Sequence, residues 1–157
     1  ELPKEDLIMT FSMLLNLVSA CGSEEETTLW GFINRYAPNV KRNEHPGLGK
    51  AVEYAVRYYK DFVKPKKKFR TAVEKERRAL IDLHARLGKM DDVAGIDELQ
   101  ALVYAVGKEN NFEQLRDWFT AIYEILLGTK TGPRLGGFIS LYGIKETRNL
   151  IVDKLGL

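Results

Sequence analysis

The segment Gly132-Pro-Arg-Leu-Gly-Gly137 is the part of the sequence best suited to hold a ligand. Glycine lets a ligand approach backbone N–H and C=O groups closely, and the guanidinium of Arg134 offers a planar fork of donors to carbonyl oxygens or phosphate. Pro133 and Leu135 add apolar walls, and Pro133 also stiffens the loop. Such a loop suits an unpaired RNA base that is turned out of its stack. A plain connection between two helices, with a structural arginine, is the alternative.

A second candidate is the basic segment Lys64-Pro-Lys-Lys-Lys-Phe-Arg70, in which five of seven residues are cationic. Pro65 keeps this segment from forming an ordinary helical surface. An extended basic loop can follow a phosphate backbone, while Phe69 offers a flat face to a base. Arg57 and Lys60 lie on the helix that leads into it. The segment therefore indicates nucleic-acid contact, with a solvated loop as the alternative.

Residues for independent catalysis are sparse. The two histidines are His45, which precedes a proline, and His84, which lies on a charged helix. The paired carboxylates Asp91 and Asp92 fall in a predicted linker, where nothing would hold them in a cleft. The sequence has neither a Gly-Lys-Ser/Thr phosphate loop nor a His-Glu-x-x-His metal pattern. An autonomous active site or metal site is therefore not expected.

Composition is that of a globular protein. The 157 residues are 45% hydrophobic and 29% charged, with a net charge of only +2, so attraction to nucleic acid must come from local clusters. The single cysteine, Cys21, fits a reducing compartment, and we expect a cytoplasmic protein. No run approaches the roughly 18 apolar residues of a membrane span. The start Glu-Leu-Pro-Lys suggests a piece of a longer protein.

Helical periodicity recurs along the whole chain, and sustained two-residue alternation is absent. The spacing of apolar residues predicts an all-α helical bundle or cage of about seven to eight helices, in two possible lobes. The lobes are 1–90, which includes the basic loop 64–70, and 95–157, with 88–95 as the linker between them. The predicted helices are 7–21 with Leu7 and Ile8 on its apolar face, 23–37 capped by Ser23, 48–63, 71–88, 96–106, 112–126, 138–142 and 144–155.

The segment 132–143, Gly-Pro-Arg-Leu-Gly-Gly-Phe-Ile-Ser-Leu-Tyr-Gly, resembles the C-terminal signature of class I lysyl-tRNA synthetases of the bacterial type. The resemblance continues, in the same order, through nearly the whole chain. It includes Phe11-Ser-Met-Leu-Leu-Asn-Leu-Val-Ser19, Leu29-Trp-Gly-Phe-Ile33, Arg35-Tyr-Ala-Pro38, Arg57-Tyr-Tyr-Lys-Asp-Phe-Val-Lys-Pro65, Val103-Tyr104, Trp118-Phe119 and Tyr123-Glu-Ile-Leu-Leu-Gly128.

The resemblance implies the C-terminal, anticodon-binding helical portion of that enzyme, which is not active alone. Its partners would be the anticodon stem-loop of lysine tRNA and the N-terminal catalytic domain, with no DNA or membrane. ATP, magnesium and lysine would bind that domain, leaving no cofactor here. The implied anticodon-binding residues are Lys130, Pro133, Arg134, Leu135, Gly136, Gly137 and Phe138, and the implied phosphate-binding residues are Arg57, Lys60, Lys64, Lys66, Lys67, Lys68 and Arg70. The alternative function is a helical protein-interaction module without RNA specificity.

Overall fold

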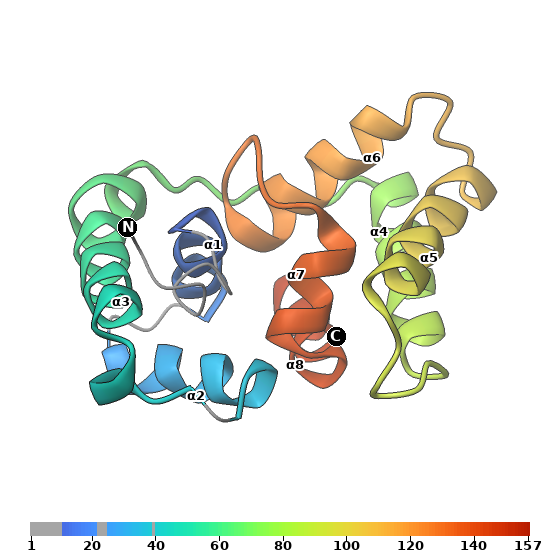
Figure 1. Cartoon of the computed structure of the whole chain (residues 1–157). Coiled ribbons are helices and arrows are strands. Elements are labelled where there is room, and N and C mark those ends of the chain that lie inside the picture. The colour runs from blue at the N-terminus through green and yellow to red at the C-terminus, as the bar shows by residue number, and fades with distance from the viewer. Residues whose placement is uncertain (1–10, 22–24, 39) are drawn as a thin grey trace. The chain divides into compact units, whose positions relative to one another are not determined.

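A computed structural model describes residues 11–21, 25–38 and 40–157. Within these ranges the chain forms eight α-helices and no strand (Figure 1). The all-α prediction and the predicted number of helices are therefore confirmed. In the same ranges, no helix is both long and apolar enough to cross a membrane. The predicted positions of Leu7, Ile8 and the cap Ser23 lie outside the described residues.

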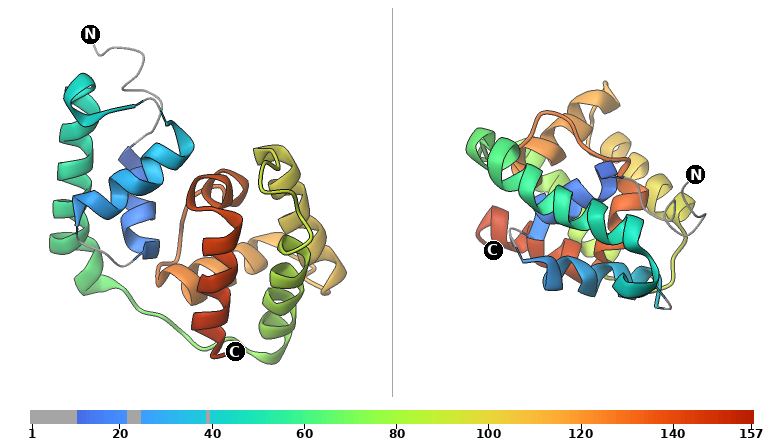
Figure 2. Two further views of the ribbon diagram at one scale, coloured as in Figure 1. Left: turned by 90° about the horizontal axis from the view of Figure 1, so that it is seen from below. Right: turned by 60° about the vertical axis from the view of Figure 1, so that its left-hand side comes forward.

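The chain divides into two compact units, one ending at Lys66 and the other beginning at Lys67. This division differs from the expected boundary at 88–95. Helix α4 (Glu74–Leu87), expected in the first lobe, packs in the second unit against α5 (Ile96–Glu109), as Figure 2 shows. The segment between them is a series of tight turns, in which the N–H of Met90 donates to the carbonyl of Leu87 (3.1 Å) and that of Ala94 to Asp91 (2.9 Å). It joins two packed helices rather than two lobes.

The first unit contains α1 (Phe11–Cys21), α2 (Glu26–Tyr36), a short 3-10 helix (Arg42–Glu44) and α3 (Pro46–Tyr58). Apolar side chains spaced by three or four residues form its core, as the periodicity predicts. The buried set is Leu14, Leu17, Val18, Leu29, Phe32, Ile33, Val40, Leu48, Val52, Ala55 and Tyr59. Helix α3 continues through a π-helical turn (Tyr59–Val63) into a 3-10 turn (Lys64–Lys66) that contains Pro65.

The second unit is completed by α6 (Leu115–Ile122), a π-helical turn (Tyr123–Leu127), α7 (Leu135–Tyr142) and α8 (Ile144–Leu155). Trp118 is fully buried, and its indole N–H donates to the carbonyl of Val103 on α5 (3.0 Å). Gly107 leaves room for this ring, because a Cβ there would lie 2.5 Å from Cδ1 of Trp118. Helix α7 begins at Leu135 instead of Phe138, so half of the predicted glycine loop is the first turn of a helix.

Candidate nucleic-acid interface

Residues 128–134 form the loop between the π-helical turn and α7, and we call them the arginine loop. Gly128 opens it with φ +74°, a left-handed conformation that favours glycine. The carbonyl of Gly128 accepts the N–H of Lys68 (2.9 Å), and the ring of Phe69 packs so closely that a Cβ on Gly128 would lie 3.1 Å from it. The non-helical segment 67–73 therefore holds the start of the arginine loop.

Tyr123 holds the other end of the arginine loop. Its hydroxyl donates to the carbonyl of Pro133 (2.6 Å), and its ring lies against Gly132, where a Cβ would approach the ring to 2.6 Å. Burial raises the pKa of Tyr123 above its ordinary value, so the hydroxyl remains protonated and able to donate at neutral pH. Thr129 adds a bond from its hydroxyl to the carbonyl of Thr131 (2.7 Å). Contacts from within the chain thus define the conformation of the loop.

The first turn of α7 packs tightly against α5. The N–H of Gly136 donates to Oε1 of the buried Gln100 (2.6 Å), and a Cβ on Gly136 would collide with the carbonyl of Ile96 and with Gln100. Close packing against α5 therefore explains why position 136 is a glycine, which was predicted from the sequence to contact a ligand.

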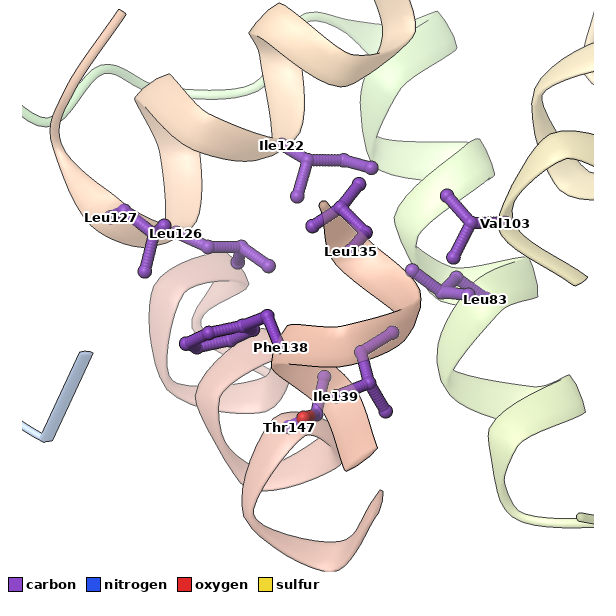
Figure 3. A pocket seen from close by; sticks show the side chains of 9 residues that line it. All are labelled: Leu83, Val103, Ile122, Leu126, Leu127, Leu135, Phe138, Ile139 and Thr147. Atoms are coloured by element: carbon purple, nitrogen blue, oxygen red, sulfur yellow. The ribbon is translucent and has the colours of Figure 1, made fainter. Parts of the chain in front are cut away.

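Leu135 and Phe138 are buried in the second unit, with 4% and 6% of their surfaces exposed. Both line an internal apolar cavity of about 10 Å³, together with Leu83, Val103, Ile122, Leu126, Leu127, Ile139 and Thr147 (Figure 3). A space of that size holds at most about one water molecule. Leu135, which was predicted to form an apolar wall for a base, and Phe138, an implied anticodon-binding residue, are therefore core side chains in this structure.

Arg134 is exposed at the end of the arginine loop, directly before α7. Its backbone carbonyl accepts the N–H of Phe138 (3.0 Å), whereas no ion pair of its guanidinium is found within the part of the chain that the structure describes. Lys130 is also exposed, Pro133 is half-buried, and Gly137 faces open space, since a Cβ there would meet nothing within 4 Å. Of these four predicted residues, Lys130 and Arg134 are therefore the two whose side chains are exposed to solvent.

The predicted phosphate-binding residues are divided between the two units. Arg57, Lys60, Lys64 and Lys66 are exposed in the first unit, where Arg57 lies 3.5 Å from a carboxylate oxygen of Glu53. Lys67, Lys68 and Arg70 belong to the second unit, where Lys68 is exposed and Lys67 is half-buried.

Phe69, predicted to offer a face to a base, contacts Gly128 and carries the ammonium group of Lys154 3.7 Å from its ring centroid. The partner Lys154 could not be predicted from local sequence, because it lies 85 residues away on α8. Tyr123 was likewise missed as a holder of the loop. An aromatic residue shortly before a glycine-rich loop is the one signal that could have indicated it.

Arg70 is engaged in internal ion pairs. Its guanidinium contacts two carboxylates, those of Glu76 of α4 (2.6 Å) and Glu124 of the π-helical turn (2.9 Å). Glu76 also accepts the N–H of Val73 (3.0 Å) at the start of α4. Arg70 therefore joins segment 67–73 to two helices, a structural role that was not predicted from the sequence.

Replacing Glu76 with Gln is expected to reduce stability in a pH-dependent way. The hydrogen bonds from Arg70 hold the pKa of Glu76 below its ordinary value, against the opposing effect of burial. A lowered pKa stabilises the folded chain above the unfolded-state pKa of about 4.3, and this contribution is lost as pH falls through the folded-state value. Urea unfolding should thus show a deficit for Glu76→Gln at pH 7 that shrinks by pH 3.

The matched control is Glu74→Gln on the same helix, because Glu74 is largely exposed and 3.8 Å from Arg78. Exposed pairs of this kind contribute little. An equal pH dependence of the two variants would contradict the structural role of the Arg70 cluster.

Groups suited to independent catalysis are dispersed. Asp91 and Asp92 are exposed in the turns between α4 and α5. His84 is partly buried, and its pKa is lowered first by burial and then by the charge of Arg148, whose Nε donates to the carbonyl of His84 (3.0 Å). Across the described ranges, no group of three or more His, Cys, Asp or Glu residues is placed to hold a metal ion.

Comparison with known proteins finds similarity to lysine–tRNA ligases. The chain is 50% identical over 151 residues to a lysine–tRNA ligase of Roseobacter denitrificans. It is 44% identical to that of Rickettsia bellii and 42% identical to that of Rickettsia akari, over 147 residues in both cases. These matches cover 94 to 96% of the chain but only 28% of each relative. No protein-family model and no solved structure matches the chain.

Proposed function

We propose that this chain is the anticodon-binding region of a class I lysine–tRNA ligase and that Arg134 reads an unpaired uridine. Similarity to lysine–tRNA ligases over almost all of the chain supports the parent enzyme. The observation that carries the site is the exposed Arg134 at the end of a loop that Tyr123 and segment 67–73 already hold in place. A loop ordered in advance avoids part of the entropy cost of binding.

The hydrogen-bonding groups of uridine match those of the arginine loop. The base presents two carbonyl oxygens on either side of one N–H. The Arg134 fork donates to a carbonyl oxygen, and the backbone carbonyls of the exposed residues Lys130 and Gly132 can accept the N–H. Because the cavity beside Leu135 is too small for a base, the uridine lies on the loop surface.

Affinity for the RNA backbone comes from cations near the arginine loop. Lys68 and Lys130 are exposed in the same unit as Arg134 and neutralise backbone phosphates without reading sequence. Activation of lysine with ATP and magnesium takes place in the part of the enzyme that lies outside the matched segment. This chain therefore supplies tRNA binding and no catalytic group.

Photocrosslinking tests this function. A lysine tRNA that carries 4-thiouridine at the second or third anticodon position should crosslink to residues 128–138, because a uridine read by Arg134 lies against the arginine loop. The same probe near the acceptor end is the matched control and should leave that peptide unlabelled. Anticodon crosslinks confined to other peptides would overturn the assignment.

A further inference from the structure

The first unit carries four aromatic side chains in a continuous row, which we call the aromatic row: Phe11 of α1, Tyr54 and Tyr58 of α3, and Phe62 of the π-helical turn. Tyr58 is half-buried between the other three, which are exposed. Ring centroids are 5.4 Å apart for Phe11 and Tyr54, 5.8 Å for Phe11 and Tyr58, 6.3 Å for Tyr54 and Tyr58, and 5.0 Å for Tyr58 and Phe62. Tyr54 is 57% exposed and Phe62 is 55% exposed.

The aromatic row is not needed for the core of this unit. The buried residues of α3 are Leu48, Gly49, Val52 and Ala55, followed by Tyr59 in the π-helical turn. Tyr54, Tyr58 and Phe62 are spaced by four residues and occupy a different face. A contiguous exposed apolar patch marks a binding surface more often than isolated exposed residues do. The aromatic row is therefore a candidate binding surface.

The charges around the row favour a polyanion. Residues 50–66 contain five cations and two carboxylates, a net charge of 5 − 2 = +3, whereas the whole chain has +2. The cations are Lys50, Arg57, Lys60, Lys64 and Lys66, and the carboxylates are Glu53 and Asp61. Glu53 is paired with Arg57. Aromatic rings beside excess positive charge are the combination by which proteins bind single-stranded nucleic acid.

We propose that the aromatic row is a stacking surface for unpaired bases of RNA, with the neighbouring cations contacting the phosphates. The inference shares with the proposed function only the class of partner, an RNA, and it does not depend on base reading by Arg134. Stacking tolerates any base, because every base has a π face. The row therefore adds affinity for single strands and little discrimination among sequences.

Binding of a fluorescein-labelled 12-nucleotide oligouridine to the full chain tests the proposal. Tyr54→Leu and Phe62→Leu should each weaken binding by about 5-fold to 150-fold, the usual range for loss of one stacked base. Tyr54→Phe keeps the ring and should bind like the unaltered chain. Tyr104→Leu is the matched control, since Tyr104 is an exposed ring of the second unit that contacts Phe119 (5.2 Å).

Three results would overturn the proposal. Leucine variants that bind oligouridine like the unaltered chain would exclude stacking, and an equal loss for a 12-base-pair RNA duplex would show that unpaired bases are not the ligand. Sedimentation showing that the row pairs two copies of the chain would assign it to a protein interface. Base reading by Arg134 is tested separately: Arg134→Ala alters the ratio among anticodon variants, whereas the row variants lower all affinities alike.

Discussion

Gly136→Ala is expected to lower the free energy of unfolding by about 2 to 6 kcal/mol, the largest stability change among the variants considered. A Cβ at this position would collide with the carbonyl of Ile96 and with Gln100, so α7 must move away from α5. Overpacking costs roughly 1 to 3 kcal/mol. The displacement also breaks the bond from the Gly136 N–H to Gln100, and a buried acceptor without its partner costs a similar amount, about 1 to 3 kcal/mol.

The neighbouring substitution Gly137→Ala is the control for this prediction. A Cβ on Gly137 would meet nothing within 4 Å, and alanine favours a helix over glycine by up to about 1 kcal/mol. Urea unfolding should therefore show a large loss for Gly136→Ala and no loss for Gly137→Ala. Equal stabilities of the two variants would mean that α7 does not pack on α5 as the structure has it.

Arg134→Ala is expected to reduce discrimination between lysine tRNA and copies with an altered anticodon. A well-placed fork of hydrogen bonds to a base edge discriminates by roughly 1 to 3 kcal/mol, by analogy with protein–DNA contacts. The ratio of dissociation constants should therefore fall by about 5-fold to 150-fold. Arg134→Lys keeps the charge but loses the fork, so it should retain general affinity and lose most of the discrimination.

Lys130→Ala provides the comparison for Arg134→Ala. Lys130 is exposed on the same loop, and a phosphate contact carries no sequence information. Its loss should weaken all tRNAs alike and reduce the salt dependence of binding by about one unit of slope. Changes in discrimination that are equal for Lys130→Ala and Arg134→Ala would contradict a special role of the guanidinium.

Periodicity predicted the helices well because burial of one helical face leaves a clear spacing in the sequence. Helix α8 spans Ile144–Leu155, the predicted range, and Leu150, Ile151 and Leu155 are buried. The start of α7 was mispredicted because two adjacent glycines indicate a loop, and the contact with Gln100 that favours the helix comes from a residue 36 positions away. The unit boundary was mispredicted for a related reason, since the packing of α4 on α5 and α8 is not visible in local composition.

Within the candidate site, the sequence could indicate which residue types are present but not which of them already have partners. Arg134 and Arg70 are both arginines in non-helical segments. One is exposed, and the other is bound to Glu76 and Glu124, the second of which lies 54 residues away. Leu135 and Gly137 are close in sequence, yet one lies in the core and the other faces open space. These differences arise from tertiary packing.

The most direct measurement is the affinity of the unaltered chain for lysine tRNA and for copies in which the second or third anticodon uridine is replaced by cytidine. Cytidine keeps the size and stacking of the pyrimidine but exchanges the carbonyl and N–H pattern of its pairing edge. If the arginine loop reads uridine, at least one replacement should weaken binding by about 5-fold to 150-fold. Equal affinities for all three tRNAs, at the same salt concentration, would contradict the reading of uridine by the arginine loop.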